Sequence, residues 1–113
     1  MTVVTFYKSS DGYIVGYRAE GHSGYGEHGQ DIVCAAVSVL TQSMCNGLTE
    51  VLKLKPDIVL KDGLLDVKLP ADLANQELKD AQILLKTLYI SLRDIASDKD
   101  YAGSVKIILK ERR

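Results

Sequence analysis

Two Asp-Gly dipeptides, Asp11-Gly12 and Asp62-Gly63, restrict the fold of this chain more than any other feature of its sequence. Each dipeptide lies between two short runs of apolar residues, and Asp-Gly in that setting is a strong signal for a tight β-hairpin turn. The sequence therefore predicts two hairpins, one over residues 3–17 and one over residues 57–69.

Each predicted hairpin is followed by a segment with helical character. A first helix is expected to begin at Asp31 and to run to about Leu54, because Asp is a preferred N-cap residue and Pro56 blocks continuation. Its first half is apolar on nearly every face, which predicts a central, buried helix. A second helix is expected from about Asp72 to Ser97. Its apolar side chains form a single stripe: Leu78, Ala81, Leu85, Leu88, Leu92 and Ile95.

A last strand is expected over Ser104–Leu109, followed by an exposed tail over Lys110–Arg113. The element order is then ββαββαβ, and each hairpin has one face that a helix can cover. These features predict an α+β fold, a two-layer α/β sandwich in which two helices cover a mixed sheet. A chain of 113 residues is long enough for one such domain, here residues 1–113, and leaves little for a second.

Charge and cysteine content exclude several classes of protein. Fourteen Lys and Arg against fifteen Asp and Glu give a net charge of −1, so we expect no direct binding to nucleic acid and no adsorption to a membrane. Residues 1–8 alternate polar and apolar side chains, unlike a secretory signal, and the apolar stretch 32–48 carries enough polar residues to indicate a buried helix. Two cysteines are too few for a disulfide scaffold, which favours a cytoplasmic protein with reduced thiols.

The residues suited to catalysis lie between the first hairpin and the first helix. A loop of small and polar residues runs from Gly21 to Gln30, with His22 at its head and Cys34 shortly after its end. The second unit passes from strand to helix without a Gly-rich loop, a His or a Cys. We therefore expect any chemistry to reside in the first unit.

Cys34 occupies the first helical turn if Asp31 is the N-cap residue. The unpaired amides and the positive end of the helix dipole would then favour the thiolate, and the amides could donate to a developing oxyanion. His22 precedes Cys34 by twelve residues, and the loop between them must return to the same sheet edge. The two side chains can thus come within hydrogen-bond reach, as a Cys–His pair for acyl transfer requires.

Each of these residues also has a simpler structural interpretation. Cys34 alone is typical of a small buried helix residue, Asp31 of a helix cap, and His22 of a turn residue that donates to a backbone carbonyl. Cys45 is a useful comparison, because it lies three turns and about 16 Å further along the same helix, too far for a disulfide with Cys34. Without a helix terminus or a histidine beside it, Cys45 is interpreted as structural.

Two other kinds of site, a dinucleotide site and a zinc site, are alternatives to the Cys–His pair. Gly24 to Gly29 formally matches GxGxxG, but the preceding strands form a hairpin and the helix leads to no parallel strand, which disfavours a dinucleotide site. A zinc site from His22, His28, Asp31 and Cys34 matches no common spacing. We therefore expect neither a cofactor nor a metal.

The segments Gly21–Tyr25 and Gly29–Ser38 together closely resemble the motif of the ribosomal-processing cysteine protease family, Prp (also called YsxB-like). The length and the ββαββαβ order are similar as well, so the resemblance covers essentially the whole chain. It implies an endopeptidase that removes a short N-terminal extension from a large-subunit ribosomal protein, number twenty-seven, during ribosome assembly. It also implies a homodimer.

The resemblance implies a role for individual residues. His22 matches the general base, Cys34 the nucleophile and Asp31 the acidic position before the helix, where it could orient His22 besides capping the helix. Gly21 and Ser38 match the motif as supporting residues. The segment from Ser23 to Gln30 matches the one that shapes the substrate cleft. Its substrate-loop residues are Ser23, Gly24, Tyr25, Gly26 and Gly29.

A second class of function remains open from the residues alone. The chain could be a non-catalytic ribosome-assembly or protein-binding module, in which the stripe of the second helix contacts a partner and Cys34 is merely buried. Thiol alkylation at near-neutral pH separates the two, because a reactive Cys34 beside an inert Cys45 indicates the enzyme.

Overall fold

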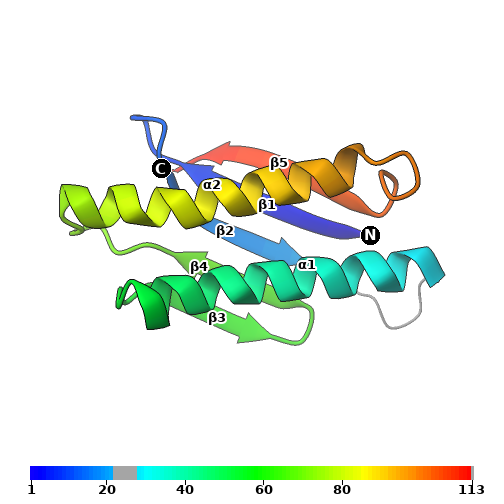
Figure 1. Cartoon of the computed structure of the whole chain (residues 1–113), viewed down its shortest axis with the longest axis horizontal. Helices are drawn as coiled ribbons and strands as arrows, with labels where there is room; N and C mark the ends of the chain where they lie inside the picture. Colours follow the sequence, from blue (N-terminus) through cyan, green and yellow to red (C-terminus); the bar gives the residue numbers. More distant parts are fainter. Residues whose placement is uncertain (22–27, 113) are drawn as a thin grey trace.

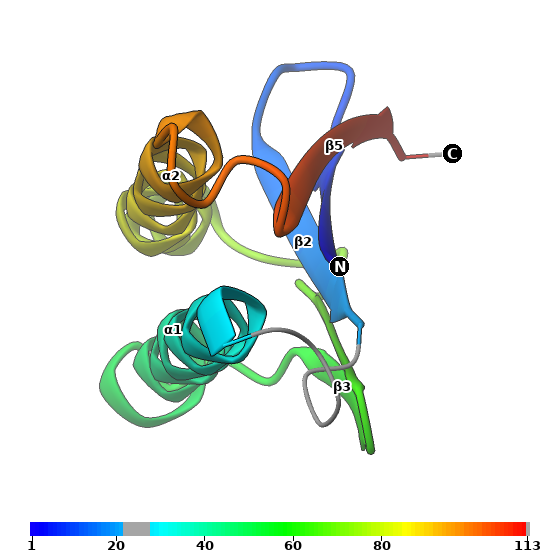
Figure 2. The same cartoon turned by 90° about the vertical axis from the view of Figure 1, so that its right-hand side faces the viewer.

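The computed structural model describes residues 1–21 and 28–112, with side chains in the second range from residue 32 onward. Five strands form one sheet, and two helices pack on the same face of it (Figures 1 and 2). The elements are β1 (Thr2–Lys8), β2 (Ile14–Glu20), α1 (His28–Asn46), the π-helical turn η1 (Gly47–Val51), β3 (Asp57–Lys61), β4 (Leu64–Lys68), α2 (Asn75–Ser97) and β5 (Val105–Glu111). The predicted ββαββαβ order and two-layer α+β fold are confirmed.

The sheet is mixed, with the strand order β3-β4-β2-β1-β5. Both predicted hairpins are present, β1 with β2 and β3 with β4, and β4 also pairs antiparallel with β2. β5 pairs with β1 in parallel, so that Thr2 lies opposite Val105. β1 is therefore an inner strand, held between its hairpin partner and the last strand of the sheet.

The core lies between the sheet and the two helices. Alternation along β1 directs Thr2, Val4 and Phe6 inward, and all three are buried. The predicted stripe of apolar side chains along α2 is confirmed. Ala81, Leu85, Leu88 and Leu92 are completely buried, while Leu78 and Ile95 are partly buried against the same cluster.

A buried glutamine joins α2 to the start of β2. Gln82 accepts from the backbone N–H of Ile14 through Oε1 at 2.7 Å and donates through Nε2 to the carbonyl of Ile14 at 2.8 Å. The register of the β1–β2 pair shifts between Tyr7 and Lys8, opposite this point. The side chain thus pairs backbone groups that the irregular ladder leaves free.

The first helix differs from its prediction in three respects. It begins at His28 instead of Asp31, because an Asp is also tolerated inside a first turn, where its charge complements the helix dipole. It ends as an α-helix at Asn46 and continues as η1, short of Leu54. Only one of its faces is buried, since a two-layer fold covers a helix on one side. Val39, for example, is 65% exposed.

Residues Ile32–Val51 are long and apolar enough to cross a membrane, judged by length and composition alone. A helix that packs in a domain core meets the same criterion. Val33, Val37 and Leu48 of this stretch are buried in the core formed with the sheet, as in such a helix.

The boundaries of the last two elements also differ slightly from the prediction. α2 begins at Asn75 instead of about Asp72 and ends at Ser97 as expected. β5 includes Lys110 and Glu111, which were expected in the tail. They are exposed, but they pair with Tyr7 and Lys8 of β1, because the parallel register extends to the end of that strand.

Candidate active site

A pocket of about 230 Å³ opens between α1, the end of β2 and the β3–β4 turn with its flanking residues. Its lining includes Thr2 from β1, Gly21 after β2, Cys34 and Ser38 from α1, and the β3–β4 turn at Gly63. Three of these positions, Gly21, Cys34 and Ser38, are ones that the sequence singled out. The turn at Gly63 belongs to the second hairpin, so that hairpin contributes to the wall of the pocket. The expectation that the chemistry itself resides in the first unit stays a prediction.

Cys34 lies at the inner wall of this pocket. Its side chain is 7% exposed, and its Sγ lies 2.8 Å from the Thr2 hydroxyl in a buried hydrogen bond in which either atom can donate. Because α1 starts at His28, Cys34 is in the second helical turn and not the first. The prediction that Cys34 lies in the first turn is therefore wrong, and a contact of its sulfur with the unpaired amides of that turn stays a prediction.

Gly21 is fixed by contacts on both sides. Its φ is +140°, and a Cβ at this position would lie 2.5 Å from the Met1 carbonyl oxygen and 2.8 Å from Thr2 Cα. Its N–H donates to the Gly63 carbonyl at 3.1 Å. The residue before His22 is thereby held beside the N-terminal end of β1 and the β3–β4 turn, at the rim of the pocket.

Ser38 follows Cys34 by four residues, so both lie on the same face of α1. Ser38 is exposed and lines the pocket beside the buried residues Cys34, Val37 and Thr41 of the same helix. Its hydroxyl can therefore meet a ligand that enters the pocket, which fits its place as a supporting residue.

The remaining predicted site residues are only partly covered by the structure. His22 and the loop residues Ser23, Gly24, Tyr25 and Gly26 lie outside the described residues. Gly29 was expected in the loop, but it belongs to the first turn of α1.

The side chain of Asp31 is likewise outside the description, and its backbone lies within the helix. The prediction that it is the N-cap residue is wrong. Its orientation of His22 stays a prediction.

Thr2 lines the pocket, but the sequence motif did not indicate it. One signal could have: the residue is polar, yet the alternation of β1 places it on the inner face with Val4 and Phe6. Its contact with Cys34, however, joins residues 32 positions apart, which no local pattern specifies.

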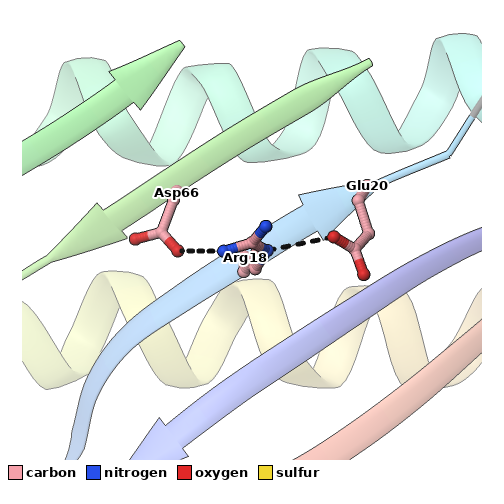
Figure 3. A network of polar contacts seen from close by, with 3 residues as sticks. All are labelled: Arg18, Glu20 and Asp66. Carbon is pink, nitrogen blue, oxygen red and sulfur yellow. Dashed lines mark hydrogen bonds and ion pairs between the residues drawn. The ribbon is translucent and has the colours of Figure 1, made fainter. Parts of the chain in front are cut away.

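Charged side chains surround the pocket on its open side. Glu20 from β2 lines it together with Lys61 at the end of β3 and Asp62 from the β3–β4 turn. On the sheet face away from the helices, Arg18 Nε lies 3.0 Å from Glu20 and its Nη1 lies 3.4 Å from Asp66 (Figure 3). The carboxylate of Glu20 is therefore partly neutralised.

Within the described residues, no group of three or more His, Cys, Asp and Glu side chains is arranged to hold a metal ion.

Cys45 lies in a different environment. It is half-buried and packs against the core, and burial raises the pKa of its thiol. A higher pKa leaves less thiolate at neutral pH, so this sulfur is a weaker nucleophile there. The structure is consistent with its interpretation as a structural residue.

A family profile described as cysteine protease Prp matches residues 1–106 of the chain. The chain belongs to this family. A ribosomal processing cysteine protease Prp of Bacillus subtilis (strain 168) is 28% identical over 109 residues, covering 95% of this chain and 96% of the relative. Its counterpart in Staphylococcus aureus (strain Mu50 / ATCC 700699) is 29% identical over 112 residues, covering 97% of this chain and all of the relative.

Solved structures of Prp agree with the sequence comparison. The S. aureus Prp in complex with a substrate peptide has a TM-score of 0.83 and 25% identity, and the same protease with a covalently linked product peptide has a TM-score of 0.79 and 28% identity. Each alignment covers 97% of this chain and 100% of the other. This chain is accordingly a cysteine protease with the Prp fold, and the prediction of an enzyme is confirmed.

Proposed function

We propose that this protease removes the N-terminal extension from the precursor of large-subunit ribosomal protein number twenty-seven during ribosome assembly. The names of the Prp relatives support processing of a ribosomal protein. The peptide complexes of the S. aureus enzyme support a peptide as the partner that enters the site. The observation that carries the proposal in this chain is the placement of Cys34 in the wall of a pocket that opens to solvent.

Cys34 and His22 form the working pair of this proposal. The Cys34 thiolate attacks the scissile carbonyl, and the protonated His22 gives its proton to the leaving amine as the peptide bond breaks. His22 then takes a proton from water, which attacks the acyl-enzyme and releases the second product. Asp31 orients His22, and Ser38 and Gly21 shape the pocket around the acyl group.

The cleavage assay uses the purified protein and the extended ribosomal substrate. Cys34→Ala and His22→Ala are each expected to reduce cleavage by about 10³-fold or more, because each removes a group that the chemistry requires. Cys45→Ser is the matched control in the same helix and is expected to keep most of the activity. Mass spectrometry of the products identifies the bond that is cut. Cleavage by Cys34→Ala at the unsubstituted rate would overturn the proposal.

We propose further that the protein acts as a homodimer. Several large apolar side chains on the outer faces of the helices are exposed, including Ile32 and Val39 from α1 and Ile83 and Ile90 from α2. Burying such side chains between two copies would stabilise an association. Sedimentation equilibrium at micromolar concentration is expected to give twice the chain mass, and a monomer under those conditions would contradict the proposal.

We place the protein in the cytoplasm, where a ribosomal precursor is met and where thiols stay reduced. The two cysteines are free, in keeping with that compartment. Cell fractionation followed by immunodetection tests the location, and recovery in the membrane or secreted fraction would contradict it. Contact with a membrane or with nucleic acid is not part of the proposed function.

A further inference from the structure

Thr2 brings a hydroxyl to the sulfur of the proposed nucleophile. Its side chain is on the inner face of β1, only 6% of the residue is exposed, and Oγ1 lies 2.8 Å from Cys34 Sγ. Among the described residues, Thr2 is the side chain that contributes a hydrogen bond to this sulfur. A polar group buried at the edge of an apolar core is costly unless it has such a partner.

The backbone around Thr2 is held from several sides. Its N–H donates to the Ser104 carbonyl at 3.0 Å, and its Cα lies against Gly21, where no Cβ intervenes. β1 is also paired along its length with β2 on one side and β5 on the other. The backbone that carries the hydroxyl is therefore held by β5, by the Ser104 carbonyl and by the contact with Gly21.

The chemistry of the two ionisation states gives this contact a direction. When Cys34 is a neutral thiol, either atom can donate. When Cys34 is a thiolate it has no proton, so only the Thr2 hydroxyl can donate, and a hydrogen bond to the charged form favours that form. The contact is thus stronger in the state that attacks the substrate.

We propose that Thr2 is a positioning residue that holds the Cys34 sulfur and donates to it as a thiolate. This inference rests on the proposed role of Cys34 as the nucleophile. Thr2 takes the role of thiolate donor that the sequence had suggested for the unpaired helix amides, because those amides lie in the turn before Cys34. The Thr2 hydroxyl is a neutral donor. The charged residues that line the pocket, Glu20, Lys61 and Asp62, come from other elements and carry mixed signs.

The experiment measures alkylation of Cys34 by iodoacetamide as a function of pH, in the full chain carrying Cys45→Ser so that a single thiol reacts. Thr2→Val removes the hydroxyl and keeps the branched shape. Thr2→Ser restores a hydroxyl. Thr5→Val is the matched control, since Thr5 is in the same strand and pairs with Arg18, whose side chain is on the face away from the helices (Figure 3).

Thr2→Val is expected to react about tenfold more slowly at pH 7, through loss of the donor to the thiolate, and no more slowly than the unsubstituted protein at pH 10. Thr2→Ser is expected to recover most of the rate at pH 7, and Thr5→Val to stay within about twofold. A purely structural role of Thr2 would not produce a loss that depends on pH. An alkylation profile of Thr2→Val that matches the unsubstituted one would overturn the inference.

Circular dichroism first checks that each variant is folded. Thr2→Ala, which removes the hydroxyl without adding an apolar group in its place, gives the same test if Thr2→Val does not fold. The alkylation assay needs no substrate, so its outcome is separate from that of the cleavage assay. A normal profile in Thr2→Val with intact cleavage by the unsubstituted protein rejects the role of Thr2 alone, whereas absent cleavage rejects the proposed function.

Discussion

Gly21 shows how one residue without a side chain can organise a site. It lies where the end of β2 meets the start of β1 and the β3–β4 turn, and its φ of +140° is a conformation that favours glycine. His22 follows it directly in the sequence. The backbone contacts of Gly21 therefore hold the residue that directly precedes the proposed general base in the sequence.

At this scale the sequence predicted some site residues and missed others for identifiable reasons. Cys34, Ser38 and Gly21 were found because they belong to a continuous motif, and the pocket contains all three. Thr2 was missed because its contact with Cys34 is made by the fold and not by spacing along the chain. Asp31 was misplaced as an N-cap because the preference for Asp at that position is only a tendency.

Gly21→Ala is expected to lower the free energy of unfolding by about 2–4 kcal/mol, because the new methyl group would meet the backbone of Met1 and Thr2 in a strained conformation. Urea denaturation followed by circular dichroism measures the loss. The contacts are with backbone atoms, so neighbouring side chains cannot relieve them by changing rotamer.

Two other glycines serve as controls for this substitution. Gly12 has a φ of +87° and open space around it, so Gly12→Ala is expected to cost only about 1 kcal/mol through the backbone. Gly103 also has open space and no such φ, and Gly103→Ala is expected to change stability by about 0.5 kcal/mol or less. Equal losses in all three variants would show that the contacts at Gly21 are unimportant.

At the scale of the elements, the sequence predicted each strand and helix but not all of their ends. The two Asp-Gly turns were found because this dipeptide favours a reversal of the chain, in a two-residue turn after β3 and within the longer connection of residues 9–13 after β1. The start of α1 was wrong by three residues, since His28, Gly29 and Gln30 join the helix despite a glycine among them. The π-helical turn after Asn46 was also missed, because no residue type signals it.

Tyr17 joins β2 to α1 and gives this contact a dependence on pH. Its ring is completely buried, and its hydroxyl donates to the Thr41 carbonyl at 2.6 Å. Burial, and to a lesser extent the nearby Cys45, raises the pKa of the Tyr17 phenol well above its ordinary value of 10.0. The folded state therefore retains the proton at a pH where the unfolded chain releases it.

Stability from Tyr17 is complete below about pH 10 and declines as the pH rises above that value, because only the unfolded state then loses the proton. Tyr17→Phe is expected to be about 1 kcal/mol less stable than the unsubstituted protein at pH 8, through loss of the hydrogen bond. The stability of the unsubstituted protein relative to Tyr17→Phe should fall by about 1 kcal/mol between pH 10 and pH 11, which removes the advantage that it has at pH 8. Urea denaturation at each pH measures it, and a difference that stays constant over this range would refute the linkage.

At the scale of the whole molecule, the number of layers followed from the sequence but the order of the strands did not. Each hairpin needs one face covered, and two amphipathic helices are available to cover them, which is enough to specify a two-layer fold. The pairing of β2 with β4 and of β1 with β5 joins segments that are distant in the sequence. No local pattern distinguishes this arrangement from others with the same elements.

The single core predicts very different costs for two substitutions in α2. Leu85 is completely buried, whereas Lys86, the next residue, is exposed. Leu85→Ala is expected to lower the free energy of unfolding by about 2–5 kcal/mol, through lost burial and the cavity it leaves. Lys86→Ala is expected to change it by about 0.5 kcal/mol or less, and chemical denaturation compares the two. Similar losses in both would contradict the assignment of the buried face.

The parallel pairing of β1 with β5 has a consequence for the order in which the molecule is assembled. Thr2, which contacts Cys34, is held by the Ser104 carbonyl and lies opposite Val105, about 100 residues later in the chain. Both hairpins and both helices can form from local contacts, whereas this pair must wait until β5 has been synthesised. A chain whose β5 has not yet left the ribosome therefore has the thiol but lacks the strand that holds Thr2 beside it.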